Sequence, residues 1–153
     1  MTSRCGRIFE DDEGCRALPA APSVELATDP ITILLNKAQK YLRSAAVLFE
    51  LEDYDSAVSR AYFAMLYAAQ ALMKRHGVRL GTGQGLRSAF IERYVQTGTL
   101  PERAGIALED GYKLMELADF AHAYAIDATQ AEHMLAESEA FVNSVSPLAA
   151  LPS

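Results

Sequence analysis

The sequence has no tryptophan, only two cysteines and no hydrophobic run long enough to cross a membrane. Cys5 and Cys15 both lie near the N-terminus without a Cys-x-x-Cys pair, which excludes a disulfide scaffold and a zinc fold as the organising principle. The longest weakly charged stretch, residues 61–73, is shorter than a bilayer requires. Acidic residues 10–13 follow where a signal peptide would have its apolar segment. We therefore expect a cytoplasmic protein without membrane contact.

The chain is acidic and of single-domain size. Its 14 Lys and Arg against 20 Asp and Glu give a net charge of -6, which argues against a broadly basic surface but permits a local basic patch. A length of 153 residues with 50% hydrophobic residues is sufficient for one hydrophobic core. We expect a disordered or loosely attached leader over residues 1–29, a helical domain over residues 30–146 and a C-terminal tail over residues 147–153.

Apolar periodicity predicts helices throughout that domain. Asp29-Pro30 is a helix-start signal, and apolar residues recur every three or four positions over residues 31–51. Residues 56–76 carry so little charge that this helix is expected inside the bundle or at a subunit interface. Further helices are predicted over residues 86–95, 101–118 and 128–145, the last of which Pro147 would end. Because no segment alternates like a strand, we predict an all-α, four- to five-helix up-and-down bundle.

Ionisable side chains gather near the end of the predicted fourth helix, at Glu116, Asp119, His122 and Tyr124. On a helix, Asp119 and His122 would be neighbours, so the carboxylate could orient the imidazole. The alternative is a solvated Asp and His at a helix end. Glu116, Asp119 and His122 are candidate catalytic groups. No residues have metal-ligand spacing, and we expect neither a metal nor a cofactor.

Arg60 and Tyr62 lie on the least polar helix. An inward-facing Arg60 would need a carboxylate partner, whereas on an exposed turn it would be solvated. The candidate partners are Asp53, Asp55, Glu116 and Asp119. Arg60, Tyr62 and His122 are our candidate binding residues. The glycine-rich residues 81–85 lack the Lys-Ser/Thr and the preceding strand of a phosphate loop, so they are expected to be a plain connection.

Residues 52–65, Glu-Asp-Tyr-Asp-Ser-Ala-Val-Ser-Arg-Ala-Tyr-Phe-Ala-Met, resemble the second helix of HEPN domains, small helical proteins often encoded beside minimal nucleotidyltransferases. Residues 89–90, 95–101 and 118–120 are similar to later blocks of that family in the same order. The resemblance covers residues 31–145. It implies a homodimeric helical bundle, and many members are metal-independent ribonucleases that act as toxins or in defence systems.

The resemblance fails at one catalytic position. Active members have an Arg and a His separated by four to six intervening residues, and in some a Tyr stands two residues after the His. His122-Ala123-Tyr124 matches the second part. The positions at which the Arg is required hold Leu117, Glu116 and Met115. We therefore predict a degenerate, non-catalytic module of a toxin-antitoxin-like system, which binds RNA or a nucleotide or docks a nucleotidyltransferase.

Two alternatives stay open. The first is a ribonuclease toxin that uses His122, with Arg60 or Lys113 as the cation at the phosphate. The second is a helical interaction scaffold, because residues 53–58 also resemble the start of a tetratricopeptide helix, although no second copy is present. The HEPN resemblance further implies that a nucleotidyltransferase partner could adenylylate Tyr124.

Overall fold

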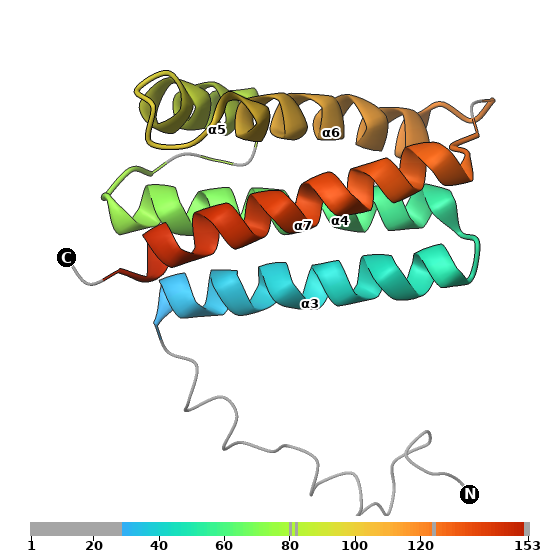
Figure 1. The fold of residues 1–153 in the computed structure, drawn as a ribbon, viewed down its shortest axis with the longest axis horizontal. Helices are drawn as coiled ribbons and strands as arrows, with labels where there is room; N and C mark the ends of the chain where they lie inside the picture. Colours follow the sequence, from blue (N-terminus) through green and yellow to red (C-terminus); the bar gives the residue numbers. More distant parts are fainter. Residues whose placement is uncertain (1–28, 80, 82, 124, 152–153) are drawn as a thin grey trace, which may run out of the picture. The chain divides into compact units, whose positions relative to one another are not determined.

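The bundle is built from four long helices joined by short connections. The computed structural model describes residues 29–79, 81, 83–123 and 125–151, and this part of the chain contains no β-strand. The long helices run in alternating directions (Figure 1): α3 (Pro30–Glu50), α4 (Tyr54–Arg75), α6 (Glu102–Phe120) and α7 (Ala128–Ala150). The short α5 (Gln84–Phe90) and the π-helix η1 (Ile91–Val95) connect α4 to α6. The predicted all-α bundle is confirmed.

α4 is the central helix of the bundle. It packs most extensively against α7 and also against α6. Twelve of its 22 residues are buried, and many are alanines, which allow close approach of neighbouring helices. The buried Ser138 hydroxyl on α7 donates a hydrogen bond of 3.0 Å to the Ala61 carbonyl. The low charge of residues 56–76 predicts a helix inside the bundle or at a subunit interface, and the structure places α4 inside the bundle.

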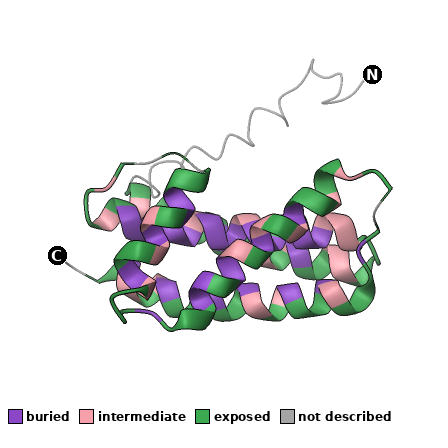
Figure 2. Ribbon diagram, turned by 90° about the horizontal axis from the view of Figure 1, so that it is seen from above, coloured by how far each residue is buried: buried purple, intermediate pink, exposed green. Residues whose placement is uncertain are grey.

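α3 lies at the outside of the bundle, on the opposite side of α4 and α7 from α6 (Figure 1). Only Ala38 and Ala45 of this helix are buried. Ring contacts attach it to α4, with centroids 5.1 Å apart for Tyr41 and Tyr67. Figure 2 shows buried residues along the middle of the bundle and exposed residues along its outer faces. The outer position of α3 leaves the cationic side chains of this helix in solvent.

Side chains and a glycine define several of the helix ends. The Asp53 carboxylate caps α4 by accepting from the Ser56 N–H at 3.3 Å. At the start of α7, Asp127 and Gln130 form a reciprocal capping box. Gly77 follows α4 with a φ of +74°, a left-handed conformation that glycine adopts without strain. These local contacts set the positions of the bundle connections.

Two helix boundaries differ from the prediction. The last helix does not stop before Pro147 but continues to Ala150. Proline removes one N–H donor, yet Val142, Val145 and Ala149 are buried along this helix and packing sustains it. The third helix begins at Gln84 and widens at its end into η1, in which the Gln96 N–H donates to the Ile91 carbonyl at 2.9 Å.

The two glycines of α6 are expected to respond oppositely to replacement by alanine. A Cβ at Gly105 would lie 3.5 Å from Ile91 and Val95, an ordinary contact, so Gly105→Ala should stabilise the helix by about 0.5–1 kcal/mol. A Cβ at Gly111 would lie 2.7 Å from Met65 and Met134 Cε, so Gly111→Ala should destabilise by about 1–2 kcal/mol. Urea unfolding measures both, and changes of the same sign would contradict this packing.

Candidate functional site

The end of α6 is exposed and acidic. α6 ends at Phe120, so His122 lies in the turn beyond the helix. Asp119 accepts a 2.9 Å hydrogen bond from the Ser59 hydroxyl of α4. Glu116 accepts one of 2.7 Å from the Tyr112 hydroxyl. Among the described residues no hydrogen bond or ion pair joins Asp119 to His122, because the helix that would align them has already ended.

The positions at which an active relative has its cation are not cationic here. Met115 is buried in the core and Glu116 is exposed. Lys113 lines a hollow between α6 and α7. Tyr124 lies outside the described residues. The acidic groups Glu116 and Asp119 thus lie near His122 in the chain, where a phosphate would meet repulsion.

Tyr62 is a core residue. Its side chain is 1% exposed, and burial raises the pKa of its hydroxyl. The hydroxyl accepts a long hydrogen bond of 3.4 Å from Arg87 Nη1, and the ring packs against Tyr112. A ligand on the surface of the bundle would therefore not reach Tyr62.

Arg60 is exposed on α4 and faces α3. Its guanidinium carbon lies 4.7 Å from the centroid of the Tyr41 ring, a cation–π geometry. Among the described residues it forms no ion pair. The carboxylate partners that the sequence suggested bond elsewhere, for example Asp55 with the Ile126 N–H. Among the described residues, no hydrogen bond, ion pair or ring contact joins Arg60, Tyr62 and His122 to one another.

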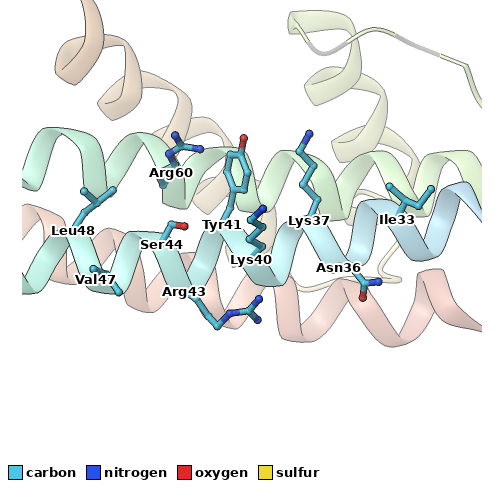
Figure 3. Close-up of a pocket in the computed structure, with 10 residues that line it drawn as sticks. All are labelled: Ile33, Asn36, Lys37, Lys40, Tyr41, Arg43, Ser44, Val47, Leu48 and Arg60. Carbon is cyan, nitrogen blue, oxygen red and sulfur yellow. The ribbon is translucent and has the colours of Figure 1, made fainter. Parts of the chain in front are cut away.

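A hollow of about 1190 Å³ runs along α3 beside Arg60, and we call it the basic hollow (Figure 3). Its lining residues are Ile33, Asn36, Lys37, Lys40, Tyr41, Arg43, Ser44, Val47, Leu48 and Arg60. Four of these are cationic and none is acidic. In a chain with a net charge of -6, this is a local region of positive potential.

Two tyrosines contact two of the four cations of the basic hollow. Figure 3 shows Tyr41 between Arg60 and Lys37, with Arg43 pointing away from them. Lys37 Nζ lies 4.9 Å from the centroid of the Tyr67 ring. The interaction with the Tyr67 hydroxyl lowers the pKa of Tyr41, and the charges of Arg60 and Lys37 lower it further. The hollow therefore stabilises negative charge at the Tyr41 oxygen.

A buried arginine, Arg87 on α5, was not singled out by the sequence. It is 3% exposed, and its Nη2 donates to Gln84 Oε1 at 2.9 Å. The guanidinium carbon lies 3.6 Å from the Tyr112 ring centroid, and Nε lies 3.8 Å from a Glu109 oxygen. In the sequence, the only indication that Arg87 is buried is its position after the apolar Leu86 in a short helix. The enclosed side chain of Arg87 contacts residues of α4, α5 and α6, and it thereby joins the three helices.

Metal binding and membrane insertion have no visible basis in the described part of the chain. No group of three or more His, Cys, Asp or Glu side chains there could hold a metal ion. None of the described helices is long and apolar enough to cross a bilayer.

Comparison with known proteins identifies the family. The model of the HEPN domain matches residues 31–148. Two proteins of Methanocaldococcus jannaschii, each named a putative toxin, are 28% and 29% identical over 110 and 117 residues, or 72% and 76% of this chain and 75% and 87% of theirs. A UPF0332 protein of Gloeobacter violaceus is 29% identical over 71% of this chain and 87% of its own. The match to the domain model spans the bundle, and this chain belongs to the HEPN domain family.

Proposed function

We propose that this protein is a toxin-like HEPN module that binds RNA or a nucleotide through the basic hollow and does not cleave RNA. The observation that carries the proposal is the group of four cations without a carboxylate among the lining residues. Phosphate oxygens are the common anions that such a surface attracts, and Lys and Arg contacts to phosphates dominate the affinity of nucleic-acid-binding proteins.

The lowered pKa of Tyr41 supports an anion site here. The charges of Arg60 and Lys37 contribute to that lowering, and the same charges would attract a phosphate oxygen. The cation–π contacts hold Arg60 and Lys37 near the tyrosines, so a ligand would order fewer side chains when it binds. The hollow is therefore partly preorganised for an anion.

The proposed loss of cleavage rests on the acidic end of α6. Phosphodiester cleavage needs a cation at the phosphate as well as a proton-transfer group. The positions at which an Arg is expected before His122 hold Leu117, Glu116 and Met115, and the nearby Asp119 is also acidic. Arg60 faces α3 instead.

A ribonuclease assay tests this absence of cleavage. We expect the purified protein with a chelator present to leave labelled single-stranded RNA intact, and His122→Ala to behave as the wild type. Binding of the same RNA should persist in both proteins, because the basic hollow is unchanged. Metal-independent cleavage that disappears in His122→Ala would establish the ribonuclease toxin instead.

The HEPN resemblance and the toxin names of two relatives support two further parts of the proposal. These are a homodimer and a minimal nucleotidyltransferase partner, which would modify Tyr124. Size-exclusion chromatography with light scattering tests the homodimer, and co-expression with such an enzyme tests the partner. A stable complex and an added nucleotide mass on the peptide that contains Tyr124 are the expected results.

A further inference from the structure

A second hollow, of about 550 Å³, lies between η1 and α6, and we call it the acidic groove. It is lined by Ile91, Val95, Gln96, Glu102, Gly105, Ile106, Glu109 and Asp110. All of its charged lining residues are acidic, and most of the others are apolar. It shares no residue with the basic hollow.

Gly105 lines the acidic groove between Ile106 and the side chains of η1. A Cβ at this position would lie 3.5 Å from Ile91 and Val95, so these aliphatic side chains pack beside the α6 backbone. The next residue, Ile106, is 54% exposed. Ile106 also lines the adjoining hollow between α6 and α7, together with Leu114 and Leu117. Ile106 thus lies between two hollows that both have apolar lining residues, and it is not an isolated exposed side chain.

The rim of the acidic groove has unneutralised negative charge. Glu102 and Asp110 are exposed, and neither forms an ion pair within the described part of the bundle. Glu109 is half-buried and lies toward the guanidinium of Arg87. Glu102 and Asp110 lie about one helical turn before and one turn after the exposed Ile106 on α6, so a carboxylate flanks Ile106 on each side.

We propose that the acidic groove docks a cationic amphipathic segment of a partner protein. An aliphatic side chain of that segment would cover Ile106 and Gly105, while Lys or Arg side chains would pair with Glu102 and Asp110. Burial of apolar surface would supply affinity, and the opposite charges would supply orientation and association rate. This proposal is independent of the proposed RNA binding, because the two hollows lie on different helices.

A synthetic amphipathic helix of Leu and Lys serves as the probe, with a peptide in which Glu replaces each Lys as its counterpart. Binding to the full chain is followed by fluorescence anisotropy. We expect the cationic peptide to bind and the acidic peptide not to bind. Glu102→Gln/Asp110→Asn and, separately, Ile106→Ser should each weaken binding at least about tenfold.

The matched control is Glu132→Gln/Glu139→Gln, which removes two exposed carboxylates of α7 and changes the net charge equally. Binding by this control should stay within about twofold of the wild type, because it leaves the groove intact. If both double variants weakened peptide binding equally, the peptide would be attracted by the overall negative charge of the protein, and the proposal would be overturned. An absence of peptide binding would also overturn the proposal. Self-association of the wild type that Glu102→Gln/Asp110→Asn abolishes would overturn it as well, because a second copy of the chain would then be the occupant.

Discussion

Arg87→Ala is expected to lower the free energy of unfolding by about 2–4 kcal/mol, because it leaves a cavity in place of a long side chain that is 3% exposed. The substitution would leave Glu109 and the Tyr62 hydroxyl without their cationic neighbour. It would also empty the space over the Tyr112 ring, at the junction of α4, α5 and α6. Urea unfolding followed by circular dichroism at neutral pH measures the loss.

Arg87→Met separates the loss of charge from the loss of volume. Arg87 Nε has no hydrogen-bond partner among the described residues, so the buried guanidinium is only partly compensated. Methionine fills much of the same space without that desolvation cost, and the expected loss is at most about 1.5 kcal/mol. A loss below about 1 kcal/mol for Arg87→Ala would contradict a structural role for this cluster.

The triple variant Lys37→Gln/Lys40→Gln/Arg60→Gln is expected to bind single-stranded RNA about 100-fold more weakly at moderate salt. Each phosphate contact contributes about 0.7 to the slope of log K against log salt for a single strand, so the slope should fall by about 2. The three side chains line the basic hollow and are not buried, so folding should be little affected. Anisotropy titrations over a range of salt concentrations give both quantities.

The control for net charge is Lys74→Gln/Arg79→Gln/Lys113→Gln, which removes three exposed cations outside the basic hollow. It should lower the affinity much less than the first triple variant. Equal losses in the two variants would mean that RNA responds to overall charge, and the basic hollow would then not be the binding site. Thermal unfolding of both variants confirms that they are folded.

The elements of the fold were largely predictable because helix signals are local. The apolar spacing of residues 31–51, the cap at Asp53 and the capping residue Asp127 each depend on side chains within one or two helical turns. The resemblance of residues 52–65 to HEPN domains also lies within one segment, and the family was confirmed over residues 31–148. Pro147 misled the prediction because its local penalty is outweighed by burial of the residues around it.

The candidate sites were less predictable because they depend on contacts between helices. Arg60 was recognised as unusual, but nothing in the chain indicated that Tyr41 of the preceding helix would lie beneath it. Helical spacing made Asp119 one possible partner of His122, with a solvated pair as the alternative, but α6 ends first and the carboxylate accepts a hydrogen bond from Ser59 of α4. The acidic groove depends on η1, a π-helix for which the sequence gives no separate signal.

Sequence patterns alone were sufficient for the helical class, the family resemblance and the missing arginine before His122, since each concerns residues that are close along the chain. Packing was needed to place Tyr62 and Arg87 in the core and to gather Lys37, Lys40 and Arg60 around Tyr41. The physical reason is that spacing along a helix determines which residues share a face, while the rotation and contact of neighbouring helices determine what that face meets.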